Sequence, residues 1–521
     1  MKKFISSLLL VLFTANVFAQ VKPPVKKEIK PVVFKLSMAH YKDKIHAIWA
    51  SQIISYYLAI KFENNEKAVK WVDKLPRPIE YAMVDDDWYY EMITIKAFEK
   101  YGVKMTVEQL GDQWLHDSCG VYGSSAVAKR AMLRGIKAPM SGHPHNNRFY
   151  FTIGPMFSSD VYGALSPGMP NLAGKLARYY GHVNGYAEGS DGAVFVAGSV
   201  SAAFSEKNMQ VVVQKASNLI DTQSPLRQCL DMVIDAHKKG VSAEEIFEKI
   251  ETTWRPIYPM PNNAVANAGI IATCLLKGEG NFLKTLNLAC IAGDNTDADC
   301  NAASAGAVIA AMHGTPSIPK ELLEGLHNRI KGDKMGGRIL PPTDETITNL
   351  ADRTVKAGVA ILKDNGINLQ NDFLVIPVQK IIAQPAEIFT VNDMLQHWDT
   401  AWKIEHARKG VYIENDALIT YPAITARSMY LYRTIKEVDK TTLLLTVAAE
   451  QNTCWKLRVF LDNDKVLEKM IAATDEGGKW QTVKIDLTKY KGKEVIVRLY
   501  QNVDFTDKWT GNAYWKKIIF E

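Results

Sequence analysis

This sequence lacks metal-binding cysteine pairs, a long membrane-spanning apolar run beyond its N-terminal segment, and a strong net charge. No CxxC pair of the metal-binding type occurs, and the six cysteines are scattered: Cys119, Cys229, Cys274, Cys290, Cys300 and Cys454. A zinc module or a dense disulfide scaffold is therefore not indicated, and we expect mostly buried thiols, with one or two disulfides left open. Beyond the N-terminal segment, no apolar run is long enough to cross a bilayer. The formal net charge of +6 at pH 7 is too small to argue for a nucleic-acid partner.

What is present is the composition of an ordinary globular protein. The 521 residues are 47% hydrophobic and 23% charged, which is enough for two or three domains. Lys2 and Lys3 precede an apolar run over residues 4–13, and Ala19 ends a small-residue cleavage pattern, so residues 1–19 are predicted to be a secretory signal peptide. A membrane anchor is less favoured because the run is too short. We expect a secreted or periplasmic protein, without a membrane partner after signal cleavage.

Most of the remaining chain has a helical pattern. Residues 20–38 are rich in Pro and Lys and predict a flexible lead-in. Residues 39–370 carry apolar side chains at helical spacing, and capping patterns such as that at Ser242 mark helix starts. The predicted helices are Asp43–Phe62, Trp88–Tyr101, Val107–His116, Ser124–Gly135, Pro170–Tyr180, Ser190–Phe204, Ser224–Lys239, Ala243–Trp254 and Ala264–Lys277. Residues 39–370 are therefore predicted to be an all-helical domain.

Residues 385–521 have the pattern of a second, antiparallel domain. Short segments rich in β-branched and aromatic residues alternate between turn signals, as at Leu443–Val447 and Trp455–Leu461. They predict a small, jelly-roll-like β-sandwich, with the boundary between residues 368 and 392. Its tryptophans are expected mostly in the core, with one or two free to stack on sugar rings: Trp398, Trp402, Trp455, Trp480 and Trp515. A carbohydrate-binding module and a purely structural partner both remain open.

Acidic residues without basic neighbours open one helix of small residues. Asp294, Asp297 and Asp299 fall within six residues, and the following run, 301–314, is mostly Ala and Gly. Such a helix suits close packing, so its first turn is expected to be buried. Carboxylates held together in a buried place must be protonated or paired with a cation, because a helix N-terminus supplies only a fraction of a charge. The stretch predicts a bound divalent cation.

A second acidic cluster, Asp85-Asp86-Asp87, precedes the predicted helix Trp88–Tyr101. On its own, the cluster also allows the less favoured alternative of an exposed helix start capped by Asp. Together with Asp297 and Asp299, it favours one site at which two helix starts converge. All-oxygen ligands favour Mg²⁺, as one or two ions, with Mn²⁺ or Ca²⁺ as alternatives, over zinc.

With these motifs, residues 40–315 resemble the ADP-ribosylglycohydrolase family. The segment from Asp43 to Glu63 matches the family's opening motif, residues 85–87 match its Thr-Asp-Asp element, and residues 297–301 match its Asp-x-Asp-Thr-Asn element. The resemblance implies an all-helical fold and two Mg²⁺ ions that orient ribose hydroxyls. It implies five metal ligands, namely Asp85, Asp86, Asp87, Asp297 and Asp299.

The resemblance also implies residues that act on the substrate. Glu63 matches an acidic residue at the end of the first helix and is the acid/base candidate, although an exposed helix-end Glu is equally open. Asp87 is the second catalytic candidate. His182, Asn184 and Gly185 match a His- and Gly-containing loop that faces the substrate in relatives, with a structural histidine as the alternative. Trp88, beside the acidic trio, completes the expected substrate-binding residues.

Departures from the family pattern concentrate in the pocket. Tyr56 stands in place of an Asp, Asp85 and Cys300 in place of Thr, and Trp88 in place of a small hydroxyl residue. In the opening helix, Ala47, Ser51, Ser55 and Ala59 stand where the family has glycines. The metal site is therefore expected to be retained, whereas the pocket beside it is remodelled with aromatic side chains. This puts ADP-ribose in doubt as the substrate.

The sequence predicts a secreted, metal-dependent glycohydrolase that cleaves a ribosyl or other glycosyl bond with a metal-activated water. The expected partner is a glycan, a riboside or a nucleoside-type small molecule. Two alternatives remain open. One is a non-catalytic sugar- or nucleotide-binding protein, favoured by Tyr56 and Trp88, and the other is a metal-stabilised structural protein.

Overall fold

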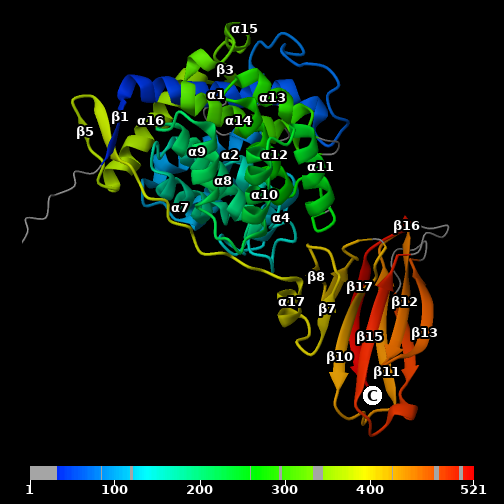
Figure 1. Ribbon diagram of the computed structural model, residues 1–521. Helices are drawn as coiled ribbons and strands as arrows, with labels where there is room; N and C mark the ends of the chain where they lie inside the picture. The colour runs from blue at the N-terminus through cyan, green and yellow to red at the C-terminus, as the bar shows by residue number, and fades with distance from the viewer. Residues whose placement is uncertain are drawn as a thin grey trace, which may run out of the picture. The chain divides into compact units, whose positions relative to one another are not determined.

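The computed structural model describes residues 32–83, 85–117, 121–258, 260–292, 296–331, 344–424, 426–473, 480–503 and 509–521 (Figure 1). The predicted signal peptide and most of the predicted lead-in lie outside these residues. The described chain has two hydrophobic cores, one within residues 36–376 and the other within residues 394–515. Helices form the first core and antiparallel sheets the second, which confirms the predicted order of a helical domain and a sandwich.

The helical domain follows the predicted pattern closely. Its α-helices are α1 Met38–Ala59, α2 Asp86–Tyr101, α3 Val107–Asp117, α4 Gly123–Leu133, α5 Gly154–Phe157, α6 Asp160–Ala164, α7 Pro170–Gly181, α8 Glu188–Ala203, α9 Met209–Ser217, α10 Pro225–Lys238, α11 Ala243–Trp254, α12 Ala264–Gly278, α13 Phe282–Cys290, α14 Ala298–His313, α15 Lys320–Glu324 and α16 Ile347–Asp364. The first helix begins at Met38 rather than Asp43 because the Ser37 hydroxyl accepts a hydrogen bond from the His40 N–H and caps it. The capping box predicted at Ser242 is present in α11.

Short strands join distant parts of the helical domain. β1 (Val33–Ser37) pairs antiparallel with β6 (Phe373–Pro377), and β5 (Leu369–Gln370) completes this sheet. The prediction of a flexible lead-in is therefore wrong for Val33–Ser37, whose main chain is held in a hydrogen-bonded ladder. A second small sheet consists of β2 (Ala82–Met83), β3 (Arg329–Lys331) and β4 (Asp344–Thr346), and it lies just before the start of α2.

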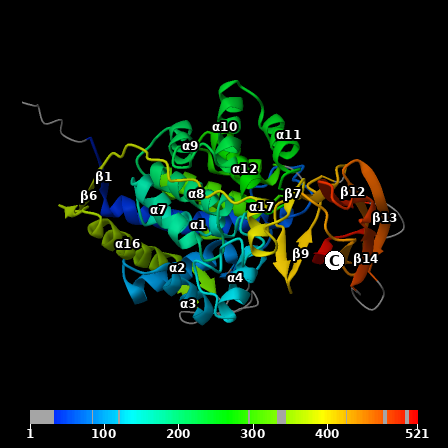
Figure 2. The same cartoon turned by 90° about the horizontal axis from the view of Figure 1, so that it is seen from below.

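Helix α14 forms the centre of the helical domain. It packs against α1, α8, α12 and α13 (Figure 1), and every residue from Ala298 to Met312 is buried. Figure 2 shows α1, α8 and α12 from below. Small side chains allow this close approach: a Cβ added at Gly306 would lie only 2.6 Å from the Ser55 hydroxyl oxygen of α1. The packing fixes the first turn of α14 beside the C-terminal end of α1.

The second domain is a sandwich of two mainly antiparallel sheets. One sheet has the order β13-β12-β15-β10-β7 and the other β14-β11-β17-β9-β8. Their bounds are β7 Lys403–Glu405, β8 Tyr412–Glu414, β9 Ala417–Thr420, β10 Met429–Ile435, β11 Thr442–Ala449, β12 Thr453–Leu461, β13 Asp464–Ala472, β14 Gln481–Asp486, β15 Val495–Asn502 and β17 Ala513–Phe520, with β16 Trp509–Thr510 paired to β12. Trp455 and Trp515 meet between the sheets, with ring centroids 5.0 Å apart. The sandwich thus has its own apolar core.

The tryptophans of the second domain are mainly core residues. Trp402, Trp455 and Trp515 are each 2% exposed or less, whereas Trp480 is 38% exposed. The cysteines follow expectation: Cys229, Cys274, Cys290, Cys300 and Cys454 are buried thiols, and Cys119 lies outside the described residues. Among the helices of the described ranges, none combines the length and the apolarity needed to cross a membrane.

Gly306→Val is expected to lower the free energy of unfolding by about 1–3 kcal/mol, because the added side chain overlaps Ser55 in the α1–α14 contact. Chemical denaturation measures the change. Glu248→Val places the same residue at an exposed position of α11 and serves as the control. Equal effects of the two substitutions would contradict the close packing.

Candidate metal centre and its cavity

Two helix starts bring the acidic residues of both sequence clusters to one place. Asp85 caps α2, its carboxylate accepting the Asp87 N–H at 3.3 Å, and Asp86 and Asp87 form the first turn. Asp297 and Asp299 occupy the start of α14. Asp85, Asp87, Asp297 and Asp299 are all buried. Asp85 therefore does act as an N-cap, but of a buried helix start rather than an exposed one.

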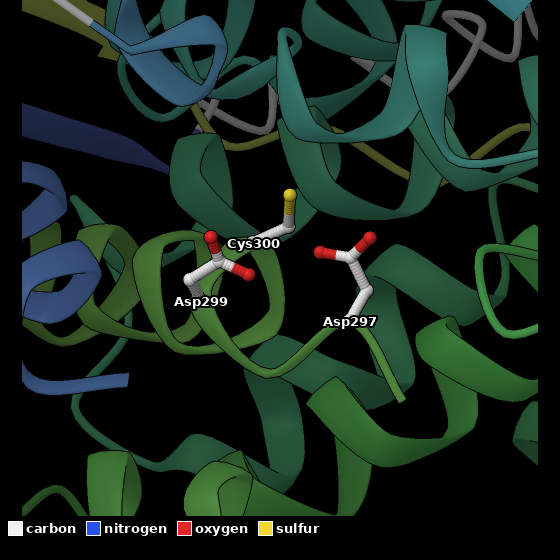
Figure 3. Close-up of side chains that lie close together, drawn as sticks. All are labelled: Asp297, Asp299 and Cys300. Carbon is white, nitrogen blue, oxygen red and sulfur yellow. The ribbon is translucent and has the colours of Figure 1, made fainter. Parts of the chain in front are cut away.

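Asp297, Asp299 and Cys300 form the tightest part of this group. Each offers one ligand atom, and these atoms all lie within 4.8 Å of one another, converging from the first turn of α14 (Figure 3). Asn262, just before α12, donates its amide N–H to the second carboxylate oxygen of Asp297. The amide fixes one oxygen of Asp297 and leaves the other available to a ligand.

The chemistry of this group fits a divalent cation. Both carboxylate oxygens of Asp87, and one each of Asp297 and Asp299, are buried without a hydrogen bond from an N–H or hydroxyl group among the described residues. The Cys300 thiol, a weak donor, faces Asp87 and Asp297. Buried carboxylate oxygens are costly unless they are protonated, hydrogen-bonded or bound to a cation. Since oxygen ligands predominate, the set suits Mg²⁺, Mn²⁺ or Ca²⁺ better than Zn²⁺.

The pKa values of the carboxyl groups also indicate that negative charge is unfavourable at this site. Burial raises the pKa of Asp299 well above its usual range, and the neighbouring Asp297, Asp87 and Glu63 raise it further. Burial likewise raises the pKa of Asp86 and of Asp87, with the other acids of their own cluster adding to the shift. Without a cation, neutral carboxyl groups are therefore favoured here.

Glu63 joins this group through a turn that the sequence did not reveal. It follows the 3-10 helix Ile60–Phe62, and Asn64 adopts the left-handed conformation with φ of 49°. The Asn64 N–H donates to the Thr296 carbonyl oxygen at 2.8 Å, which ties this turn to the residue before Asp297. Burial, together with the charges of Asp297 and Asp85, raises the pKa of Glu63 to about 7.

A cavity of about 560 Å³ opens above the acidic group. Glu63, Asp85, Asp86, Asp297 and Asp299 form its acidic part. The facing walls come from the end of α1, the start of α4, the segment around α5, and the residues before α12. The large aromatic and apolar side chains of these walls are Tyr56, Ile60, Tyr122, Ile153, Phe157 and Met260. None of the described lining residues is Lys, Arg or His. The cavity therefore combines an acidic floor with aromatic and apolar walls.

Tyr56 connects the aromatic wall to the metal ligands. Its hydroxyl forms a hydrogen bond with Asp85, and its ring packs edge-on against Trp88, with centroids 5.2 Å apart. Burial raises the Tyr56 pKa, and the charges of Asp85 and Asp299 add to this effect, so the phenol stays protonated. Trp88 itself is fully buried and does not line the cavity; it acts on the pocket through Tyr56.

The predicted His-Gly loop lies outside the cavity lining. His182 Nε2 is 2.9 Å from a carboxylate oxygen of Glu387, which also binds Arg178. Asn184 donates to the Ser125 hydroxyl at 2.9 Å and so supports the start of α4 from behind. Gly185 has no place on the cavity wall either. The structure thus favours the structural interpretation of His182, and separates these three residues from the metal centre.

A second polar layer lies one helical turn below the acidic group. Glu91 follows Asp87 by one turn on α2, and Ser304 follows Cys300 by one turn on α14. The Gln52 amide of α1 donates to Glu91 at 3.1 Å and to Asp160 of α6 at 3.2 Å. Ser304 also donates to Asp160, at 3.3 Å. These contacts tie together the helices that carry the metal-ligand candidates.

Several site residues have no recognisable signal in the sequence. Asn262 is one of them, and its role is visible only in its contact with Asp297. Tyr122, Phe157 and Met260 carried no signal, because isolated aromatic and apolar residues are usually core residues. Their common location becomes visible only once the helices are packed.

Comparisons with known proteins show the family of the helical domain. The family model for ADP-ribosylglycohydrolase matches residues 39–360. A solved structure described as an ADP-ribosylglycohydrolase-related protein complex is 14% identical, with a TM-score of 0.44, and the match covers 62% of this chain and 100% of that chain. No curated protein matches the chain.

Two other solved structures are similar in part. One described as "CBM4 structure and function" is 14% identical, with a TM-score of 0.17, over 23% of this chain and 84% of that one. A family GH115 4-O-methyl-α-glucuronidase with specificity for decorated arabinogalactans is 9% identical, with a TM-score of 0.17, over 67% of this chain and 41% of that one. All three TM-scores lie below 0.5, and no functional inference rests on them.

Asp299→Asn is expected to have two opposite effects on thermal stability. In EDTA it raises Tm, because Asn removes the cost of protonating a buried carboxyl group whose pKa is raised well above its usual range on folding. It also removes the rise in Tm that Mg²⁺ gives the wild type. At a metal concentration of 100 Kd, that rise corresponds to a gain of about 2.7 kcal/mol in the free energy of unfolding. Differential scanning calorimetry with and without metal measures both. Asp112→Asn, at an exposed position of α3, is the control.

Glu63→Gln is expected to become more stable, relative to the wild type, as pH rises from 5 to 8 in EDTA. In the folded protein the pKa of Glu63 is raised to about 7, above its pKa in the unfolded chain. The favourable contribution of Glu63 to stability is therefore complete at a pH below the pKa of the unfolded state. It is lost as the pH rises through the pKa of the folded state. Glutamine does not titrate. A difference in Tm that stays constant across this range would contradict the environment described for Glu63.

Proposed function

We propose that this chain, which belongs to the ADP-ribosylglycohydrolase family, is a divalent-metal-dependent hydrolase of an uncharged glycoside. Family membership supports a glycohydrolase type of function. The metal, the class of substrate and the site of action are our proposals. The single observation that carries them is the group of buried carboxylates, from two helix starts, at the floor of a cavity whose described lining contains no basic side chain.

The proposed metal ligands are Asp85, Asp86, Asp87, Asp297 and Asp299. These residues would hold Mg²⁺, which would supply Lewis-acid chemistry for the activation of water and the orientation of sugar hydroxyls. Asp87 is buried and does not line the cavity, so it is suited to hold the cation from below rather than to touch the substrate. We therefore propose it as a ligand, and not as a general acid or base.

Glu63 is the proposed general acid/base. It lines the cavity beside the metal ligands, and its pKa of about 7 lets it both hold and release a proton at neutral pH. Hydrolysis of a glycosidic bond passes through an oxocarbenium-like transition state, whose leaving group needs a proton. Glu63 supplies this proton to the glycosidic oxygen or nitrogen, or removes one from the attacking water.

The charges and the walls of the cavity support an uncharged substrate. A diphosphate such as that of ADP-ribose brings two negative charges, and no described lining residue offers it a cation. Tyr122, Phe157, Ile60 and Met260 instead contribute aromatic and apolar groups to the lining, which suit an aromatic or apolar leaving group. The proposed substrates are therefore neutral glycosides, ribosides or nucleosides outside the cytoplasm, in keeping with the predicted signal peptide.

A non-catalytic sugar-binding protein is the second candidate function. The observation that favours it is Tyr56, whose hydroxyl bonds to Asp85 while its ring occupies part of the cavity wall. Such an aromatic side chain beside the metal ligands suits stacking on a sugar. Turnover distinguishes the two candidates.

The test is a screen of the Mg²⁺-loaded protein against neutral furanosides and pyranosides with aromatic leaving groups, nucleosides, and ADP-ribosylated compounds. We expect metal-dependent release from at least one neutral compound, and at least tenfold lower kcat/KM for the ADP-ribosides. Preferential cleavage of ADP-ribosides would overturn the substrate assignment. Ligand binding without any turnover would establish the binding-protein alternative.

Two variants then separate the roles of the acidic residues. Glu63→Gln should lower kcat about 10²–10⁴-fold while keeping the Mg²⁺-dependent rise in Tm, because it removes proton transfer but no proposed metal ligand. Asp299→Asn should lose both activity and the metal response. A fully active Glu63→Gln protein would exclude Glu63 as the acid/base.

A further inference from the structure

We propose that the sandwich carries a second site, for a neutral oligosaccharide, in a groove beside β7 and β10 that continues onto a row of half-buried aromatic rings on the outer face of the sheet. It goes beyond the proposed hydrolysis and does not depend on it, because every residue involved belongs to the second domain.

The groove has a volume of about 800 Å³. Its walls come from the segment between α17 (Val391–Met394) and β7, from β7 itself, and from Tyr432 of β10. Gln396 and Thr400 place an amide and a hydroxyl along it, and both residues are exposed. A concave site of this size, with a few convergent polar groups, is typical of small-molecule binding.

Trp402 gives an independent indication that a ligand belongs there. Its side chain is 2% exposed and lines the groove, yet its indole N–H has no acceptor among the described residues. A buried donor without a partner costs about 1–3 kcal/mol. The indole N–H groups of Trp88, Trp114 and Trp254 in the helical domain also lack an acceptor among the described residues, so Trp402 stands apart only from the buried tryptophans of its own domain. The two other fully buried tryptophans of that domain do have an acceptor: Trp455 donates to the Ala448 carbonyl at 2.9 Å, and Trp515 to the Thr420 hydroxyl at 2.9 Å. A ligand hydroxyl in the groove would accept the Trp402 N–H.

A row of aromatic rings extends the groove across the sheet. Tyr430 pairs with Tyr500 across β10 and β15, and their ring centroids are 4.8 Å apart. Phe460 of β12 lies next, 5.4 Å from Tyr500, and Tyr432 at the other end belongs both to the row, 5.7 Å from Tyr430, and to the groove. All four rings are half-buried, and they alternate with fully buried residues such as Leu431, so they lie on the outer face of the sheet.

The chemistry of this surface selects the occupant. Ring faces pack against the C–H faces of sugar rings, while tyrosine, amide and indole groups bond to hydroxyls. Lys403 and Glu405, on the same face of β7, balance each other in charge, which favours an uncharged ligand over a nucleic acid or an acidic polymer. β7 has only three residues, which gives an added peptide strand little to pair with. A neutral oligosaccharide meets these conditions best.

The test is native electrophoresis of the full-length protein in gels containing a soluble neutral polysaccharide: galactomannan, arabinogalactan or mixed-linkage β-glucan. We expect at least one gel to retard the protein relative to a non-binding reference. Tyr432→Ala and Tyr500→Ala should raise Kd at least tenfold, and Tyr432→Phe should keep most of the binding. Trp480→Ala removes an exposed aromatic ring just before β14 of the other sheet and should leave the retardation unchanged.

Three outcomes would overturn the proposal: no retardation in any of the neutral gels, unchanged retardation of both tyrosine variants, or equal losses in Trp480→Ala. Retardation confined to a gel of polygalacturonate would contradict a neutral ligand. Asp299→Asn should bind the polysaccharide as the wild type does, so failure of the hydrolase proposal and failure of this one are distinguishable.

Discussion

The mutual repulsion of buried carboxylates at two helix starts is the constraint on which the rest of the helical domain depends. Neither α2 nor α14 carries a basic residue in its first turn, and no basic side chain lines the cavity above among the described residues. The helix N-termini offset only part of this charge. The close contact of α1 with α14, the Asn64–Thr296 hydrogen bond and the layer around Gln52 and Asp160 hold the acids together despite it. The fold thus maintains an arrangement that only a cation or protons make favourable.

Local patterns in the sequence were enough to predict most helices and strands and to select the metal-ligand candidates. Helical periodicity located most helices within a few residues, and two runs of Asp at helix starts identified Asp85–Asp87 and Asp297–Asp299. The cavity walls could not be predicted this way. Tyr122, Phe157 and Met260 come from separate segments and meet only through tertiary packing. Their spacing in the sequence therefore does not indicate that they lie close together.

The same limit explains where the expectations failed. His182 lies beside Gly and Asn, as a substrate-facing loop would, but its partner Glu387 is 205 residues away, and no local pattern predicts that pair. In the sandwich, tryptophan was the obvious stacking residue, yet two of the five fill the space between the sheets. The strand period places tyrosines on the outer face instead, as the alternation of Tyr430, Leu431 and Tyr432 shows.

Two departures from the family pattern compensate each other. Asp85 stands where the family has Thr and adds a carboxylate at the start of α2, whereas Tyr56 stands where the family has Asp and removes one from α1. The Tyr56 hydroxyl bonds to Asp85, so the two changes meet in one contact. By this resemblance, the α1 side of the cavity carries an aromatic ring where relatives carry a carboxylate. The exchange supports the proposal of a less polar substrate at a metal centre.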